Sequence, residues 1–241
     1  MNARPGAPRL VRPLLAAFLA AAALDLAGLL AGWDTAHLIA KPLLMPLLAA
    51  LAAARGGPRT LIAALLCGWG GDVLLMPDSD TAFLAGMGCF AAGHLCYLRL
   101  FGRTGVPLWD RASLRDRTSL RAGAGYAVVL TVFVAALWSG LPAGMRIPMT
   151  CYGLLLATMA WRAGTPGRRT AAGGALFLLS DALIAAGVAG LPGPPAHDFW
   201  IMLTYLAAQY LLTTGILACR NDSTRGVSRA YGEGSTRTRP R

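Results

Sequence analysis

Charged residues are scarce in this sequence. Only 14% of its 241 residues are Asp, Glu, Lys or Arg, while 56% are hydrophobic. An ordinary soluble domain carries about 25% charged residues, and the mean hydropathy of this chain is +0.54. This shortage of charge excludes an ordinary soluble protein and indicates that most of the chain lies in an apolar environment.

Histidine is also scarce, and the motifs of several hydrolase classes are missing. The three histidines, His37, His94 and His197, are too few and too scattered for a His-rich zinc site. The sequence contains no HExxH motif, no GxSxG motif and no glycine-rich loop with the lysine of a P-loop. We therefore expect neither a metal ion nor a cofactor.

The five cysteines form no recognisable framework. Cys67, Cys89, Cys96, Cys151 and Cys219 all lie inside or at the edge of apolar runs, and no two of them make a CxxC pair. An odd number of scattered thiols in apolar segments is typical of small packing residues rather than of disulfides or metal ligands.

The apolar residues are gathered into runs of about 17 to 20 residues, each long enough to cross a hydrocarbon core of roughly 30 Å. A segment in lipid has to satisfy its own backbone hydrogen bonds, and the alternating pattern of a membrane barrel is absent, so helices are expected. The sequence therefore predicts an all-α, polytopic integral membrane protein with eight transmembrane helices. The predicted spans are 13–32, 36–54, 60–76, 82–101, 121–139, 147–161, 170–190 and 199–218.

These spans divide the chain into three parts. Residues 13–218 form the predicted transmembrane domain, in which the short sixth span is expected to extend a little past both ends. Residues 1–12 are a basic tail, and residues 219–241 are a second basic tail that is rich in Gly, Ser, Thr and Arg. We expect the second tail to be disordered.

The basic residues alternate between the two sides of the predicted membrane domain. The two tails and every second connection hold 20 of them, whereas the opposite connections hold only Arg146, and Lys41 lies within a span. Because short cytoplasmic loops carry the excess of Lys and Arg, both termini are predicted to be cytoplasmic. Cleavage of residues 1–32 as a signal peptide is disfavoured, since 13–32 is long for such a segment and its removal would break the alternation.

The net charge of +11 requires a separate interpretation. The basic residues lie in short connections and lack the interleaved aromatic residues of a nucleic-acid face, so no nucleic-acid partner is expected. The basic composition with high Gly and Ala content favours a bacterial protein with high genomic GC. We expect a multi-pass protein of a bacterial cell membrane.

Polar residues recur at matching places four predicted helices apart. Pro42 and Pro148 open spans two and six, Asp72 and Asp181 lie in spans three and seven, and polar groups recur midway in spans four and eight. This echo fits two four-helix halves of the same orientation. Identity beyond these positions is poor, so chance remains the alternative.

A few polar side chains lie at membrane depth, where ionisable groups are costly and suggest function. From the span directions, one polar cavity that opens toward the non-cytoplasmic side would accommodate them all. The ionisable residues are Asp25, Lys41, Asp72, His94 and Asp181, joined by the uncharged Tyr205 and Gln209.

Each of these residues also has a structural interpretation. Asp72 and Asp181 could pair with Lys41 or with a backbone donor and so fix helix packing. His94 could be a hydrogen-bonded packing residue, and Asp25 could cap a helix or reach the interface. The glycines that precede Asp72 favour close helix approach under either interpretation.

The functional interpretation rests on two buried carboxyl groups. With one lysine, one histidine and one glutamine nearby, two acids in an apolar cavity are expected to differ, one holding its proton and the other ionised beside the lysine. This arrangement predicts general acid–base chemistry without a nucleophile or a metal ion.

The polar residues fall into ordered motifs along the chain. The motifs are Lys41-Pro42, Gly71-Asp72, Phe83-x-x-Gly86, His94-x-x-Tyr97, Ser180-Asp181 and Tyr205-x-x-x-Gln209. Together they resemble the YhhN-type lysoplasmalogenase family over residues 14–218. Each dipeptide alone is weak, but the ordered set on eight spans is fairly specific. Span five, the fourth connection and the C-terminal tail carry no motif.

The resemblance implies a membrane hydrolase that cleaves the vinyl ether bond of a lysoplasmalogen, which is a lysophospholipid, into a fatty aldehyde and a glycerophospho-headgroup. A related lysolipid or enol ether is the alternative substrate. It also implies catalytic roles as proton donor and water-orienting base for Asp72 and Asp181, and leaves open which does which. Lys41 would hold the phosphate or tune one acid.

The remaining residues of the motifs have supporting roles in this interpretation. His94 would shuttle protons, and Tyr205 and Gln209 would hydrogen-bond the glycerol hydroxyl or water. Ser180 and Tyr97 are further supporting residues, and Asp25 is the weakest candidate of the whole set.

Two other functions compete with an enzyme. A small proton-coupled secondary transporter would use buried carboxyl groups as relays and would suit a two-fold repeat. However, paired Gly/Pro interruptions that would unwind a helix in both halves are absent. A structural membrane protein would leave the buried acids without a purpose.

Overall fold

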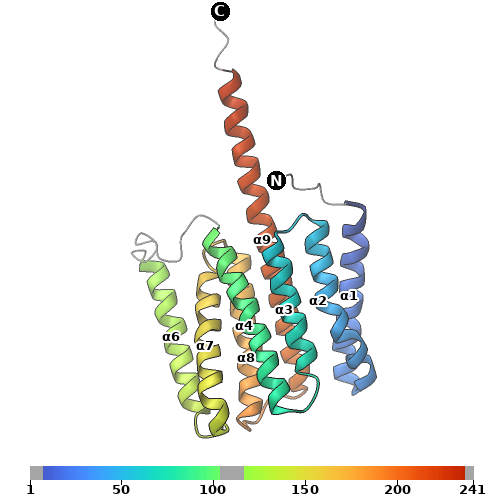
Figure 1. Ribbon diagram of the computed structural model, residues 1–241, viewed down its shortest axis with the longest axis vertical. Helices are drawn as coiled ribbons and strands as arrows, with labels where there is room; N and C mark the ends of the chain where they lie inside the picture. The colour runs from blue at the N-terminus through green and yellow to red at the C-terminus, as the bar shows by residue number, and fades with distance from the viewer. Residues whose placement is uncertain (1–7, 104–116, 237–241) are drawn as a thin grey trace, which may run out of the picture.

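A computed structural model describes residues 8–103 and 117–236 and contains only helices as regular structure in those ranges (Figure 1). The helices run roughly along one axis and form a single bundle. They are α1 (Pro8–Ala31), α2 (Asp34–Ala54), α3 (Arg59–Leu74), α4 (Asp80–Arg103), α6 (Arg117–Leu137), α7 (Ala143–Arg162), α8 (Arg168–Val188) and α9 (His197–Thr236).

The predicted all-α class is confirmed. Each predicted span falls on one of these helices, and α7 extends past both ends of 147–161, as the short sixth span led us to expect. Six helices are long and apolar enough to cross a membrane, namely α1, α2, α4, α6, α8 and α9. The chain is therefore a multi-pass membrane protein, although α3, with 16 residues, and α7 fall outside this group.

The two tails differ from the expectation. The N-terminal helix begins at Pro8, inside the predicted tail 1–12, and α9 continues to Thr236, where a disordered segment from residue 219 was expected. Adding a residue to an existing helix costs far less than nucleating a new one, because each further residue gains one hydrogen bond. A polar sequence can therefore continue a helix that the membrane domain has already started.

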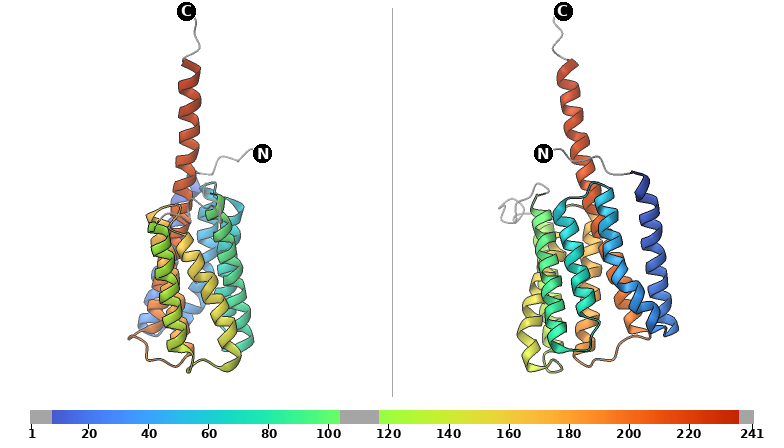
Figure 2. Two further views of the ribbon diagram at one scale, coloured as in Figure 1. Left: turned by 90° about the vertical axis from the view of Figure 1, so that its left-hand side faces the viewer. Right: turned by 45° about the vertical axis from the view of Figure 1, so that its right-hand side comes forward.

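The cross-section of the bundle is elongated. It is wide in Figure 1 and much narrower in the turned view of Figure 2, with α6 at one edge and α1 at the other. The most extensive packing joins α1 to α2, α3 to α4 and α8 to α9. A continuous core of buried Leu, Met and aromatic side chains links α2, α3, α4, α7, α8 and α9, and Phe18 of α1 also belongs to it.

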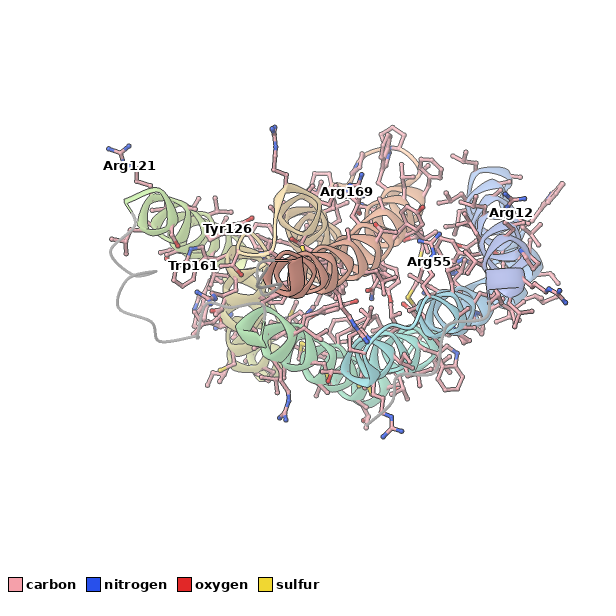
Figure 3. The ribbon with its side chains drawn as sticks, turned by 90° about the horizontal axis from the view of Figure 1, so that it is seen from above. Arg12, Arg55, Arg121, Tyr126, Trp161 and Arg169 are labelled. Atoms are coloured by element: carbon pink, nitrogen blue, oxygen red, sulfur yellow. The ribbon has the colours of Figure 1, made fainter. Side chains whose placement is uncertain are left out.

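Both α1 and α9 have their outer ends on the same side of the bundle, where Arg12, Arg55, Arg121 and Arg169 gather (Figure 3). On this side the indole Nε1 of Trp161 donates a hydrogen bond to the Ser119 carbonyl oxygen at 2.9 Å and ties α7 to α6. One end of the bundle is therefore rich in arginine, as the loop charges predict.

Glycine allows α7 and α8 to approach closely. A Cβ atom added at Gly174 would lie 2.8 Å from Ala163 Cβ and 2.9 Å from Ala160 Cα, so backbone would have to move. Small residues at such crossings replace the hydrophobic driving force that helices lack within lipid.

We predict that Gly174→Ala destabilises the bundle by about 1–3 kcal/mol, because the added methyl group overpacks a contact made by backbone atoms. Gly88→Ala is the matched control, since a Cβ atom there meets nothing within 4 Å on the exposed face of α4. Thermal unfolding in detergent micelles measures both. Equal melting temperatures for the two variants would contradict the close packing of α7 on α8.

Candidate active site

Asp72 ends a chain of buried hydrogen bonds that crosses three helices. The Tyr205 hydroxyl donates to Asp72 Oδ2 at 2.8 Å, and Gln209 Nε2 donates to the Tyr205 hydroxyl oxygen at 3.3 Å. The Tyr97 hydroxyl in turn donates to Gln209 Oε1 at 2.6 Å. Asp72 is 4% exposed, and its three partners are at least as buried. We call these four residues the Asp72 group.

The sequence around Asp72 is shaped to admit these partners. Tyr205 and Gln209 are four residues apart and therefore share one face of α9. A Cβ atom at Gly68 would lie 3.0 Å from both Gln209 Nε2 and the Tyr205 hydroxyl, and one at Gly71 would lie 2.5 Å from the Phe90 ring. The glycines before Asp72 thus give α9 and α4 room to reach it.

Lys41 is the cation that interacts electrostatically with the Asp72 group. It lies partly buried on α2, and its charge acts on Asp72, as does the charge of Asp181. The structure thus brings Lys41 and Asp72 within electrostatic reach of one another, without a salt bridge between them in the described ranges.

Asp181 belongs to a second hydrogen-bonded group. The Tyr152 hydroxyl donates to Asp181 Oδ2, and His94 Nε2 lies 3.0 Å from the same hydroxyl oxygen. Because the hydroxyl proton is given to Asp181, a neutral His94 donates through Nε2–H. His94 Nδ1 is then a buried acceptor without a partner in the described part of the chain. These three residues, from α4, α7 and α8, are the Asp181 group.

Aromatic rings connect the two groups. The Phe177 ring meets the His94 ring edge to face at 4.8 Å between centroids and the Tyr205 ring at 5.5 Å. Phe90 contacts both Phe177 and Tyr205 in the same manner. The two carboxyl groups are therefore joined through apolar rings rather than through a shared hydrogen bond.

A cavity opens on the Asp181 group and not on the Asp72 group. It lies between α4, α6, α7 and α8, and its polar lining residues are Asp181, Tyr152 and Thr150. Asp181 is only partly buried, in contrast to Asp72. The other lining residues are mostly apolar: Leu75, Phe83, Met87, Phe90, Leu130, Phe133, Val134, Leu137, Leu141, Met149, Gly153, Leu156, Leu178, Ala182, Ile184 and Ala185.

The expectation of one polar cavity for all the membrane-depth residues is therefore wrong. This cavity is apolar apart from the three side chains named above, and neither Asp72 nor Lys41 lines it. The reason is physical: Asp72 and Asp181 each accept a hydrogen bond from a tyrosine hydroxyl on a different helix, which supplies a partner without a shared aqueous space.

Two predicted site residues lie elsewhere. Ser180 Oγ donates to the Ile201 carbonyl oxygen at 3.1 Å and holds α8 against α9. Asp25, which is fully buried on α1, forms a pair with His37 of α2, with 2.8 Å between Asp25 Oδ1 and His37 Nδ1. The Asp25–His37 pair is thus a third polar contact, which shares no residue with the Asp72 group or the Asp181 group.

Sequence reasoning missed Tyr152, Phe90, Phe177 and His37. Tyr152 is the most important omission, because it links Asp181 to His94. Its signal was a single tyrosine within an otherwise apolar span, and a buried tyrosine hydroxyl nearly always has a partner. The two phenylalanines gave no signal, since aromatic residues in a membrane helix are ordinary.

The fold and these polar groups define a class: an all-helical, multi-pass membrane protein with buried carboxyl groups, one of which faces an apolar cavity. Residues 36–216 match the model of the YhhN family. The chain belongs to the YhhN family.

Several curated proteins are similar to this chain. A lysoplasmalogenase named TMEM86B from Sus scrofa is 36% identical over 177 residues, which cover 72% of this chain and 70% of the relative. The rat protein of the same name is 36% identical over 188 residues, 77% of this chain and 74% of the relative. A lysoplasmalogenase of Mycobacterium bovis is 33% identical over 162 residues, 65% of this chain and 60% of the relative. No solved structure matches.

We predict that Asp25 and His37 stabilise the contact of α1 with α2. Asp25→Asn should lower the free energy of unfolding by about 1–3 kcal/mol, because a buried charge-assisted hydrogen bond is weakened. A double-mutant cycle with His37→Asn, followed by thermal unfolding in detergent, measures the coupling. Additive losses would show that the two side chains do not stabilise each other.

Proposed function

We propose that this chain is a membrane-embedded lysoplasmalogenase, which hydrolyses the vinyl ether bond of a lysoplasmalogen to a fatty aldehyde and a glycerophospho-headgroup. The observation that carries the proposal is Asp181, a carboxyl group on the wall of an apolar cavity. Membership of the YhhN family and the names of the curated relatives support it.

The reaction needs one positioned acid and one water molecule. The acid transfers a proton to the β-carbon of the vinyl ether, and the double-bond electrons form the new C–H bond. The resulting oxocarbenium ion is attacked by water at the α-carbon, and the water gives up a proton to the carboxylate. The hemiacetal then collapses to the aldehyde and the free glycerol hydroxyl. This sequence is general acid–base catalysis with electrostatic stabilisation of a cation.

Asp181 is suited to both proton transfers. Tyr152 donates to its Oδ2, so the proton for the substrate resides on Oδ1. Once that proton has moved, the carboxylate lies beside the oxocarbenium ion and can orient the water. An apolar cavity strengthens this ion pairing, because the effective dielectric constant there is low.

Asp72 is the second acid of the proposed site. The Phe90 and Phe177 rings separate Asp72 from the Asp181 group, so Asp72 acts on Asp181 through their electrostatic interaction. Lys41 offsets part of its charge, and Tyr205, Gln209 and Tyr97 hold its orientation. His94 exchanges protons with solvent or with Asp181 through the Tyr152 hydroxyl.

We further infer that all eight helices cross the membrane and that both termini are cytoplasmic. In Figure 1 α3 and α7 extend between the same two ends of the bundle as their neighbours α4 and α8. The arginine-rich end, with Arg12, Arg55 and Arg169 (Figure 3), is then the cytoplasmic end. A bacterial cell membrane remains the expected location.

We predict that Asp181→Asn lowers vinyl ether hydrolysis by about 100- to 10,000-fold, the usual effect of removing a general acid. Purified protein in nanodiscs is given a lysoplasmalogen, and aldehyde release is followed. Asp72→Asn is expected to lower the rate as well, while Asp198→Asn, an acid in the first turn of α9, serves as the control.

Three outcomes of this assay are decisive. The absence of aldehyde with wild-type protein across several lysolipids would refute the enzyme and favour a transporter or a structural protein. Full activity of Asp181→Asn would show that Asp181 has no catalytic role, and full activity of Asp72→Asn would show the same for Asp72.

We predict that a cysteine placed at Asp78 or at Asp198 reacts with a membrane-impermeant maleimide added outside intact cells. A cysteine at Arg55 should react only after permeabilisation. The experiment requires a background in which the five native cysteines are replaced. Labelling of the Asp78 position from the cytoplasm would reverse the proposed orientation.

A further inference from the structure

Arg146 is isolated from the other basic residues of the chain. It lies in the first turns of α7, at the end of the bundle opposite the clustered arginines. The connections at this end, residues 32–33, 75–79, 138–142 and 189–196, contain no lysine or arginine. An arginine at this end has no topogenic purpose, because the charge rule favours positive residues on the other side.

The Arg146 side chain contacts a residue that lines the cavity. Its Nε donates to the Leu141 carbonyl oxygen at 3.2 Å, and its Cζ lies 5.5 Å from the centre of the Trp138 ring. Leu141 itself lines the cavity. Both contacts leave the terminal nitrogens of the guanidinium group available, and Arg146 forms no salt bridge within the described ranges. Such a group is suited to bind a phosphate by two parallel hydrogen bonds.

The spacing from Arg146 to the Asp181 group fits a glycerophospholipid. Arg146 and Tyr152 are six residues apart on α7, which corresponds to about 9 Å along the helix axis. In a lysoplasmalogen, seven covalent bonds join the phosphorus atom to the β-carbon of the vinyl ether, about 8 to 9 Å when extended. Since Tyr152 contacts Asp181 directly, this rise along α7 is similar to the length of lipid that separates the phosphate from the β-carbon.

We propose that the cavity between α4, α6, α7 and α8 binds the hydrocarbon chain of a single-chain ether phospholipid, and that Arg146 binds its phosphate. This inference rests on the proposed function and assigns the substrate-binding site for it. Beyond Asp181 the chain lies against Phe90, Leu130 and Leu156, which continue the apolar lining.

The assignment predicts the selectivity of the site. Arg146 recognises the phosphate, which ethanolamine and choline lipids share, so the two headgroups should bind with similar affinity. It also gives Arg146 a different role from Lys41, for which the resemblance left open whether it holds the phosphate or tunes one acid. Lys41 does not line the cavity, and its charge acts on Asp72 instead.

We predict that Arg146→Gln weakens binding of a 1-O-alkyl lysophospholipid by about 10- to 100-fold, the usual contribution of a hydrogen bond to a charged group. The saturated ether of this probe has no double bond to protonate, so binding is measured without turnover. Binding of 1-O-alkylglycerol, which lacks the phosphate, should be unchanged. The concentration dependence of the melting temperature in detergent micelles gives both affinities.

Matched variants separate the phosphate contact from a loss of folding. Arg146→Lys should retain part of the phospholipid affinity, because it keeps the charge but not the bidentate geometry. Arg121→Gln, an exposed arginine at the opposite end, should bind both probes as wild type does. Equal weakening of both probes by Arg146→Gln, or weakening by Lys41→Gln and not by Arg146→Gln, would overturn the assignment.

The proposed position of the hydrocarbon chain is tested with a variant that partly fills the cavity. Ala182→Leu places added volume on the lining of the cavity and should weaken binding of a 16-carbon alkyl probe more than that of an 8-carbon probe. Ala92→Leu, on an exposed face of α4, is the control. Unchanged binding of the long probe to Ala182→Leu would place the chain elsewhere.

These measurements distinguish the binding site from the reaction. Phosphate-dependent binding without aldehyde release from a lysoplasmalogen would refute the proposed reaction and retain the site. Aldehyde release by wild type, together with a phospholipid affinity that is unchanged in Arg146→Gln, would retain the reaction and refute the site.

Discussion

The cost of an unpaired carboxyl group inside an apolar bundle governs this structure. A polar group without a hydrogen bond in hydrocarbon costs several kcal/mol, and an ionised one costs more. Each buried aspartate therefore accepts a hydrogen bond from another helix: Asp72 from Tyr205, Asp181 from Tyr152 and Asp25 from His37. These bonds join α3 to α9, α8 to α7 and α1 to α2, so the same contacts that satisfy the acids also fix the helix pairs.

The surroundings of the two central acids give them different roles. Asp72 is sealed by the close approach of α4 and α9, which the glycines of α3 permit. Asp181 has the same kind of donor, but the loosely attached α6 leaves a cavity beside it. An acid that reacts with a lipid must meet the lipid, whereas an acid that acts through its charge does not. In the proposed reaction, the packing of one peripheral helix thus separates the acid that meets substrate from the acid that supports it.

Much of the helix arrangement could be predicted, because hydrophobic length and loop charge are properties of a linear sequence. The partners of Asp181 could not be. Helices that are apolar on every side carry no stripe that marks which face turns inward, so nothing in the spacing brought Tyr152 to Asp181 or separated Asp72 from the cavity. The internal repeat also stays a prediction: Tyr205 lies on the last helix and Tyr152 on α7, which are not matching positions in two four-helix halves.

The proposed site binds a lipid at two points, and this has a consequence for the proposed turnover. While the vinyl ether is intact, the chain in the cavity and the phosphate at Arg146 are held by one covalent tether, and each contact raises the effective concentration of the other. Hydrolysis cuts the molecule between these two contacts. The aldehyde then keeps only the apolar contact, with the bilayer as a competing solvent, and the headgroup keeps only the contact with Arg146, with water as its competitor. Cleavage therefore converts a tightly held substrate into two weakly held products, and release requires no movement of the buried hydrogen bonds that keep the helices together.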